Sequence, residues 1–172
     1  ITLASYEYDA DGNMTLQRNA AGDVMTYEYA GRLIVKETWR NGLAWYFEYD
    51  GTGVGSRCVH TWGDGGIYDH RLTFREGVTE VLDSHEKLTV YHHRGGLVWK
   101  KVDANGGEHL WRYDDSRRLL AQTDPLGNST LYRYDRWGNC TDSSDPCGGS
   151  VSAVYPGKGN LRNRPVSVTT PD

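Results

Sequence analysis

The sequence has few of the residues that build compact helical cores. Phe and Met occur only 2 times each among 172 residues, whereas Tyr occurs 12 times and Trp 6 times. Gly occurs 21 times, well above its usual share of about 7 %. This balance disfavours a helical bundle and favours a structure rich in turns.

Long apolar runs are absent as well. No stretch approaches the roughly 20 apolar residues that a membrane helix needs, and no segment has the pattern of a signal peptide. We therefore expect no membrane span. The sequence begins at Ile1 and stops within a repeating pattern, so we expect it to be a fragment of a longer chain.

Basic residues are neither in excess nor clustered. Lys and Arg number 19 against 23 acidic residues, which gives a formal net charge of -4 and argues against a nucleic-acid partner. The three cysteines, Cys58, Cys140 and Cys147, have no metal-binding spacing and are expected to be reduced thiols. A Cys140 to Cys147 disulfide is the minor alternative.

Internal repetition is the strongest signal in the sequence. An aromatic-x-Tyr element, usually followed by Asp, recurs about every 21 residues, and Asp83, Asp103, Asp124 and Asp145 repeat with the same period but out of phase. Two markers with one period predict a repeat array over residues 1–172, with about eight units and a divergent stretch between about 52 and 95. The copies of the element are Tyr6-Glu-Tyr8-Asp9, Tyr27-Glu-Tyr29, Phe47-Glu-Tyr49-Asp50, Trp111-Arg-Tyr113-Asp114 and Tyr132-Arg-Tyr134-Asp135.

One unit, from Asp124 to Asn139, shows the expected local structure. It opens with Asp124-Pro-Leu-Gly127, residue types that suit a type I turn followed by a left-handed glycine. A run with alternating aromatic residues then leads to a second turn that starts at Asp135. Each unit is therefore predicted to be a β-hairpin. The expected turn centres are Gly12, Gly22, Gly42, Gly106, Gly127, Gly138 and Gly148.

The predicted fold class is all-β, with tandem hairpins forming one coiled antiparallel sheet. A single hairpin is marginally stable in water, so the hairpins must pair edge to edge. Strand twist then prevents a long sheet from staying flat. Because side chains alternate along a strand, the repeated tyrosines share one face, where we expect them to stack as a ladder. These tyrosines are Tyr8, Tyr29, Tyr49, Tyr113 and Tyr134.

The repeated pattern resembles a known family. Asp-Pro-x-Gly, about five residues, and then Tyr-x-Tyr-Asp-x-x-Gly-Asn is present almost intact from Asp124 to Asn139 and is similar to the Rhs/YD repeat. The stretch 46–70 is similar to bacterial Rhs proteins linked to type VI secretion. The repeat signature comprises Tyr8, Asp9, Gly12, Tyr29, Tyr49, Asp50, Tyr113, Asp114, Asp124, Pro125, Gly127, Tyr134, Asp135, Gly138 and Asn139.

The resemblance implies a part of a β-cage wall in a polymorphic toxin used in bacterial competition. In such proteins the repeats enclose a C-terminal toxin domain. The implied partners are further YD repeats of the same polypeptide, the enclosed toxin and, through N-terminal regions, secretion-apparatus tip proteins and a chaperone. The implied route is folding in the bacterial cytoplasm followed by secretion or delivery into a target cell. No cofactor is expected.

Four side chains around a Gly-rich turn form a candidate metal site: His60, Asp64, Asp69 and His70. A hairpin would place His60 opposite His70 with carboxylates nearby, as metal binding requires. The alternative is that residues 64–66 are simply the turn and the histidines are polar strand residues. We favour this alternative and expect no metal.

Asp124 and Asp145 are the candidate catalytic pair. Members of the Rhs family that this sequence resembles cleave themselves with two aspartates in Asp-Pro-x-Gly motifs about one repeat apart. Asp124 and Asp145 both lie in such a motif. Two carboxylates that share a proton suit a protease. Nearly every unit places an Asp in this register, however, so we favour a turn-forming role.

Carbohydrate recognition is the remaining alternative, because Trp and Tyr rings on a β-scaffold can stack on sugars. Trp39, Trp45, Trp99 and Trp137 have no fixed place in the repeat and are the candidates. Aromatic residues at the repeat period more often fill a sheet face. The leading prediction is a non-enzymatic shell segment that encapsulates a toxin domain, ahead of a carbohydrate-binding repeat module and an autoproteolytic segment.

Overall fold

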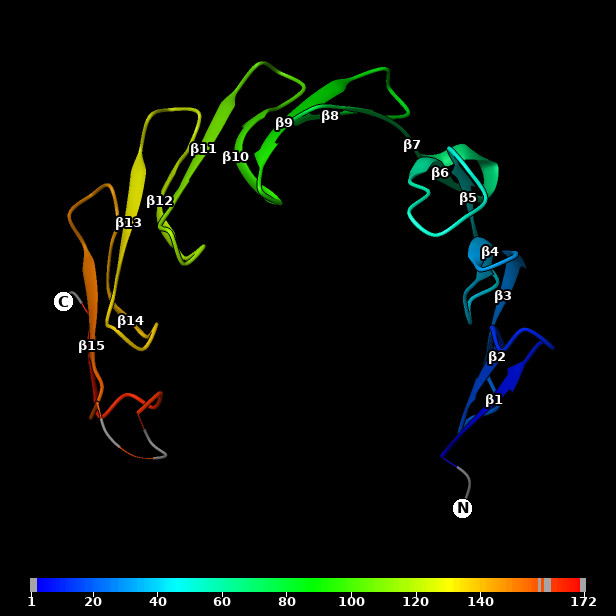
Figure 1. Cartoon of the computed structure of the whole chain (residues 1–172), viewed down its shortest axis with the longest axis horizontal. Helices are drawn as coiled ribbons and strands as arrows, with labels where there is room; N and C mark the ends of the chain where they lie inside the picture. Colours follow the sequence, from blue (N-terminus) through cyan, green and yellow to red (C-terminus); the bar gives the residue numbers. More distant parts are fainter. Residues whose placement is uncertain (1–2, 158, 160–161, 171–172) are drawn as a thin grey trace. The chain divides into compact units, whose positions relative to one another are not determined.

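The computed structural model describes residues 3–157, 159 and 162–170. Within these residues sixteen strands form one antiparallel sheet, and their order in the sheet follows the sequence from β1 to β16. No α-helix occurs in the described part of the chain, so the predicted all-β fold class is confirmed. Figure 1 shows the hairpins in sequence order.

Two compact units make up the chain. The first comprises Ile1–Arg75 and Glu80–Leu88, and the second comprises Glu76–Thr79 and Thr89–Asp172. Strands β1 to β8 are Ala4–Tyr8, Met14–Asn19, Val24–Ala30, Leu33–Thr38, Ala44–Tyr49, Cys58–Gly63, Ile67–Arg75 and Val78–Leu82, with the 3-10 turn η1 (Asp64–Gly66) before β7. Strands β9 to β16 are Leu88–Arg94, Leu97–Val102, Glu108–Tyr113, Leu119–Thr123, Ser129–Tyr134, Cys140–Ser144, Ser150–Val154 and Ser167–Thr169.

Short turns capped by an aspartate join many of these strands. In the turn before β13, the N–H groups of Leu126 and Asn128 each donate to Asp124 Oδ1 over 2.9 Å. The N–H of Gly127 donates to the Asp124 carbonyl, and Gly127 adopts φ 85°, a left-handed conformation that suits glycine. The predicted turns are confirmed, since the same positive φ occurs at Gly12, Gly22, Gly42, Gly106, Gly127, Gly138 and Gly148.

Two turns of this kind lack the glycine. Glu86 (φ 58°) and Arg117 (φ 65°) occupy the position that glycine has in the other turns. The N–H of each donates to the carbonyl of the turn aspartate, Asp83 and Asp114 respectively. The turn geometry is therefore kept even where the side chain is unfavourable for it.

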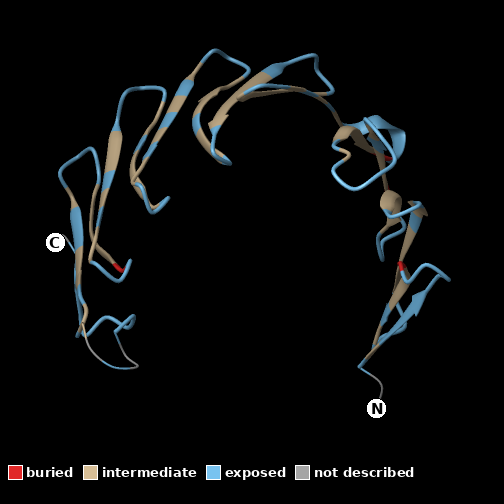
Figure 2. Ribbon diagram, viewed as in Figure 1, coloured by how far each residue is buried: buried red, intermediate tan, exposed pale blue. Residues whose placement is uncertain are grey.

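Within the described residues, no second layer of secondary structure covers the sheet, and there is no conventional core. The chain exposes 11828 Å², whereas a compact protein of its 19.4 kDa mass exposes about 8,500 Å². Ala44 is the only fully buried hydrophobic residue in the described part of the chain, and Figure 2 shows intermediate and exposed residues almost throughout. Stability must therefore come mainly from contacts between neighbouring strands.

The next two features are membrane-spanning helices and disulfide bonds. No helix among the described residues has the length and apolar character to cross a membrane. Cys58, Cys140 and Cys147 are all free thiols, so the alternative Cys140 to Cys147 disulfide is not formed.

Candidate functional site: contacts between repeats

The second tyrosine of the repeated element links neighbouring strands. The hydroxyl of Tyr134, at the end of β13, donates to the carbonyl oxygen of Leu119, at the start of β12, over 2.9 Å. Two further copies make the same bond at the same distance and with the same separation in sequence. These are Tyr29 to Met14 and Tyr49 to Ile34. The bond thus recurs in three of the five copies of the element.

Burial raises the pKa of Tyr29, Tyr49 and Tyr134 above the usual value for tyrosine, because desolvation disfavours the phenolate. The usual value is already about 10, so each hydroxyl is protonated at neutral pH and can donate to the backbone carbonyl of the preceding strand.

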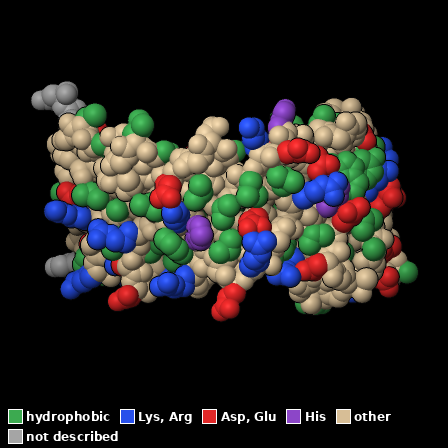
Figure 3. All heavy atoms as spheres, turned by 90° about the horizontal axis from the view of Figure 1, so that it is seen from above, with side chains coloured by type: hydrophobic (Ala, Val, Ile, Leu, Met, Phe, Trp, Pro, Cys, Tyr) green, Lys and Arg blue, Asp and Glu red, His purple; other side chains and the backbone are tan. Residues whose placement is uncertain are grey.

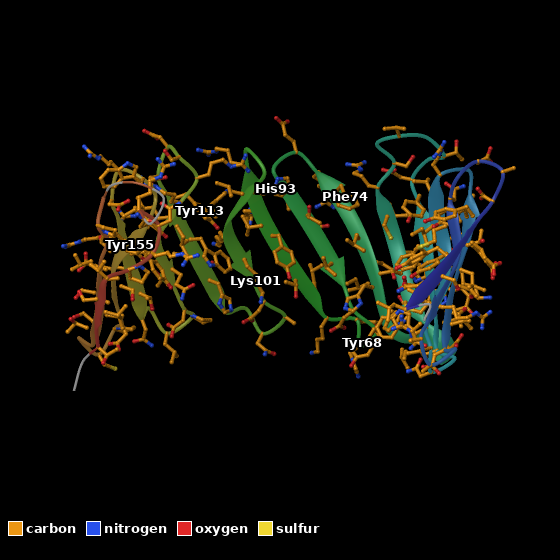
Figure 4. All side chains as sticks on the ribbon, turned by 90° about the horizontal axis from the view of Figure 1, so that it is seen from below. Tyr68, Phe74, His93, Lys101, Tyr113 and Tyr155 are labelled. Atoms are coloured by element: carbon orange, nitrogen blue, oxygen red, sulfur yellow. The ribbon has the colours of Figure 1, made fainter. Side chains whose placement is uncertain are left out.

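The predicted stacked ladder of tyrosines is wrong. Among the described residues, no aromatic ring pairs with any of the five repeated tyrosines. Their partners on the paired strands are not aromatic: Tyr134 lies opposite Cys140, and Tyr113, labelled in Figure 4, lies opposite Leu119. Tyr8 is 61 % exposed. Tyr29, Tyr49 and Tyr134 instead use the hydroxyl for contact with a neighbouring strand.

The Asn that follows the turn glycine makes a second link, in the other direction along the sequence. Asn139 Nδ2 donates to Asp135 Oδ2 over 2.8 Å and to the carbonyl of Arg162 over 3.0 Å. Asn13 repeats this arrangement, with bonds to Asp9 and to the carbonyl of Gly31. Both asparagines are buried, so their amide groups depend on these partners.

Arg118 replaces the asparagine in a third copy. Its Nε donates to Asp114 Oδ2 over 2.7 Å, and its Nη1 donates to the carbonyl of Asp135 over 3.1 Å. The guanidinium also lies over the Tyr134 ring, 5.1 Å from the centroid. A longer side chain therefore makes the same link to the next turn.

The signature aspartates are turn residues. Each accepts backbone N–H bonds within its own loop, and at Asp50 the loop is longer and closed by Arg57. Pro125 occupies the second position of the Asp124 turn, as expected from its fixed φ. The aspartates that cap their turns are Asp9, Asp50, Asp114, Asp124 and Asp135.

The structure does not bring the candidate catalytic aspartates together as an acid pair. Asp124 Oδ1 accepts from its own turn, and Asp145 Oδ1 likewise accepts from the N–H groups of Cys147 and Gly149. The side-chain and backbone N–H groups of Asn128 hold the pKa of Asp124 below its usual value.

The candidate metal ligands also have separate partners. The register pairs His60 with Arg71 and Thr61 with His70, so His60 is not opposite His70. Asp69 and Glu48 lie 3.0 and 3.1 Å from the two different ring nitrogens of His60 and cannot converge on one ion beside the imidazole. Among the described residues, no group of three or more His, Cys, Asp or Glu side chains has the geometry for a metal.

Asp64 and His70 have other partners. Asp64 Oδ2 accepts from the N–H of Ala44 over 2.8 Å, and its Oδ1 accepts from the Tyr46 hydroxyl over 2.9 Å. His70 Nδ1 lies 2.6 Å from the carbonyl of Tyr68. Residues 64–66 form the 3-10 turn η1, which agrees with the turn interpretation.

The four tryptophans considered for sugar binding have different neighbours. Trp39 and Trp45 pair at 5.6 Å between ring centroids, Trp99 lies 5.5 Å from His92, and Trp137 lies beneath the Arg136 guanidinium. A different tryptophan, Trp111, lines a hollow of about 410 Å³ in the second unit. The polar groups around it come from His109, Gln122, Asp124, Asn128 and Thr130.

Comparison with known families identifies the repeat. The RHS Repeat family model matches residues 113–150, which run from the end of β11 to the start of β15. Residues 113–150 match an RHS repeat. The predicted resemblance to the Rhs/YD-repeat family is therefore confirmed, and the link to type VI secretion stays a prediction. A comparison with curated proteins gives no match.

Solved structures share the fold of this chain. Crystal structures of TcdB2-TccC3, TcdB2-TccC3-Cdc42 and TcdB2-TccC3-TEV match with TM-scores of 0.58, 0.53 and 0.52. Sequence identity is 13 % in each case. The matches cover 99 %, 99 % and 98 % of this chain, respectively, but only 11 % of each matched chain.

Proposed function

We propose that this chain is a wall segment of an Rhs toxin shell that encloses a C-terminal toxin domain before delivery. The observation that carries the proposal is the use of the repeat side chains: Tyr134 reaches back to the preceding strand and Asn139 reaches forward to the next turn. These residues join repeats to one another. The RHS-repeat match and the shared fold support the same role.

The proposed mechanism is steric exclusion without catalysis. Strands in a sheet lie about 4.8 Å apart and are joined by hydrogen bonds, so the wall leaves no opening for a macromolecule. Asp124 and Asp145 resemble a catalytic pair, but each accepts N–H hydrogen bonds from its own turn. Confinement of a toxin by such a wall needs no tight binding.

The remaining parts of the proposal come from the family resemblance. The partners are further YD repeats of the same polypeptide, the enclosed toxin domain, and tip proteins and a chaperone of the secretion apparatus. The protein would fold in the bacterial cytoplasm and then be secreted or delivered, with type VI secretion as the proposed route.

Protease protection tests the enclosure. The natural gene product that contains this segment is incubated with a protease of broad specificity, and fragments are identified by mass spectrometry. A toxin domain beyond Asp172 is expected to stay intact while exposed loops are cut. The double variant Tyr134→Phe/Asn139→Ala, which removes both links, should speed cleavage of the toxin domain. Tyr132→Phe/Asn128→Ala is the matched control.

Two results would reject the shell role. One is a gene product without any domain beyond the repeats. The other is a toxin domain that is cut equally fast in the wild type and in the double variant.

A second candidate function is carbohydrate recognition, favoured by the hollow around Trp111. Its ring lies 6.1 Å from that of His109 in a stacked arrangement, and Gln122, Asn128 and Thr130 supply polar groups. An aromatic platform with amide and hydroxyl groups is suited to a sugar ring. Binding to a glycan array that is lost in Trp111→Ala and retained in Trp137→Ala would support this function, and no binding would reject it.

A further inference from the structure

The middle residue of the aromatic-x-Tyr element changes its charge between the two units. It is acidic in the first unit, at Glu7, Glu28 and Glu48, and basic in the second unit, at Arg112 and Arg133. All five are exposed, because they alternate with aromatic residues that point to the opposite face. The face opposite the tyrosines is thus acidic at these positions in one unit and basic in the other.

Two of the three acidic positions have partners within the first unit. Glu28 forms an ion pair with Lys36 at 2.8 Å, and Glu48 lies 3.1 Å from His60 on the paired strand. The basic positions differ. Arg112 lies opposite Ala121, and Arg133 lies opposite Asp142 without an ion pair. Neither arginine has a carboxylate within salt-bridge distance in the described part of the chain.

A third cation shares a hollow with Arg112. Arg94, also exposed and without an ion pair among the described residues, lines a hollow of about 390 Å³ together with Arg112, Leu97 and Trp99. The register pairs Leu97 with Arg94, and the Trp99 ring packs against His92, two residues before Arg94 on the same face. Two arginines therefore line the same hollow as a tryptophan that is 42 % exposed.

Apolar side chains continue this surface along the second unit. Leu110 and Leu131 are 40 % and 46 % exposed, and each is two residues before one of the arginines. Figure 3, which views the side opposite that of Figure 4, shows hydrophobic side chains among both basic and acidic ones. The nearby Glu108 is already held by Lys100 at 2.5 Å. The surface thus combines unpaired positive charge with exposed apolar area.

We propose that Arg94, Trp99, Leu110, Arg112, Leu131 and Arg133 form a docking surface for an acidic peptide segment of another protein. Arginine and carboxylate form paired, charge-assisted hydrogen bonds, so three free guanidinium groups complement a row of acidic side chains. Exposed Trp and Arg residues are typical anchors in protein interfaces. The leucines fit an apolar or aromatic residue between the acids. This inference is independent of the shell role.

Fluorescence anisotropy with the 172-residue chain tests the proposal. The probe is a fluorescein-labelled peptide, Glu-Asp-Glu-Phe-Glu-Asp-Glu, compared with an analogue in which Gln and Asn replace the acids. The acidic peptide should bind, the neutral analogue should not, and added salt should weaken binding because it screens exposed charges.

Point variants locate the surface. Arg112→Gln and Arg133→Gln should each weaken binding about threefold to fivefold, the range expected for exposed ion pairs. Trp99→Ala should weaken it further through loss of the apolar anchor. Arg32→Gln, which removes the same charge from an exposed turn of the first unit, should bind like the wild type. Circular dichroism confirms that each variant is folded.

Three results would overturn the proposal. The arginine variants could bind like Arg32→Gln, the neutral analogue could bind as well as the acidic peptide, or a sulfated polysaccharide could bind where the acidic peptide does not. The last result would assign the surface to a different class of polyanion.

Discussion

At the residue scale, the turns determine where each strand begins and ends. A type I turn followed by a left-handed residue needs an acceptor at its first position and tolerance of positive φ at its fourth. Asp124 and Gly127 meet both needs. Glu86 and Arg117 hold the same conformation with ordinary side chains, which costs about 1–2 kcal/mol relative to glycine.

Replacing one of these residues by glycine should therefore stabilise the protein. Glu86→Gly is expected to raise the free energy of unfolding by about 1 kcal/mol, because glycine adopts φ near 58° without steric cost. Urea denaturation followed by tryptophan fluorescence measures the change. Gly127→Ala is the reverse control. A β-carbon there meets no neighbouring atom within 4 Å, so any loss of stability reports the backbone conformation alone. An unchanged midpoint in both variants would contradict this account of the turns.

The turn aspartates also predict how stability depends on pH. The amide groups of Asn128 lower the pKa of Asp124, so its folded-state pKa lies below the unfolded value near 3.9. The stability contributed by the ionised cap is present above that unfolded value and is lost as pH falls through the folded-state pKa. Unfolding midpoints measured between pH 5 and pH 2 should fall in the wild type. The fall should be smaller in Asp124→Asn, and an equal fall in both proteins would show that Asp124 is not linked to folding.

At the scale of strands and hairpins, side-chain bonds to backbone carbonyls join one repeat to the next. Tyr134 contacts the start of the preceding strand, and Asn139 contacts the carbonyl of Arg162 in the segment that follows. Because the sheet has one layer and almost no buried hydrophobic residues, such bonds carry more weight than they would beside a packed core.

Removing the tyrosine hydroxyl should have a measurable cost. Tyr134→Phe is expected to lower the free energy of unfolding by about 1 kcal/mol, since the ring stays and only the bond to Leu119 is lost. Tyr132→Phe is the matched control on the same strand and face, because no hydrogen bond of its hydroxyl occurs among the described residues. Chemical denaturation compares the two variants, and equal losses would contradict the proposed link.

The asparagine link can be isolated in the same way. Asn139 and Asn128 make the same bond to their own turn aspartates, but only Asn139 also reaches a later segment. Asn139→Ala should therefore cost about 1 kcal/mol more than Asn128→Ala, because it also removes the hydrogen bond to the carbonyl of Arg162. Thermal unfolding of both variants measures the difference. A difference near zero would mean that the bond to Arg162 contributes no stability.

The sequence predicted the hairpins and turns because their signals are local. Asp124, Pro125 and Gly127 each favour one position of a turn, and residues of these types recur at the repeat period. The links between repeats were missed because they depend on register. Tyr134 reaches Leu119 only when two strands are aligned, and no property of tyrosine alone distinguishes that bond from ring stacking. The buried Asn139 after a turn glycine, repeated at Asn13, was the available clue.

At the scale of the whole molecule, the RHS repeat and the shared fold agree with the repeated links. Five repeat side chains donate a hydrogen bond to the backbone of a neighbouring strand or turn: Tyr29, Tyr49, Tyr134, Asn13 and Asn139. A chain built in this way is suited to extend a wall, since each added hairpin meets the same contacts as the last. The proposed shell role follows from that property.

Electron cryo-microscopy of the natural gene product that contains this segment tests the shell role most directly. The account predicts a continuous β-sheet wall that includes residues 1–172, with density for a C-terminal toxin domain inside it. A toxin domain outside the wall, or repeats that enclose nothing, would contradict the account.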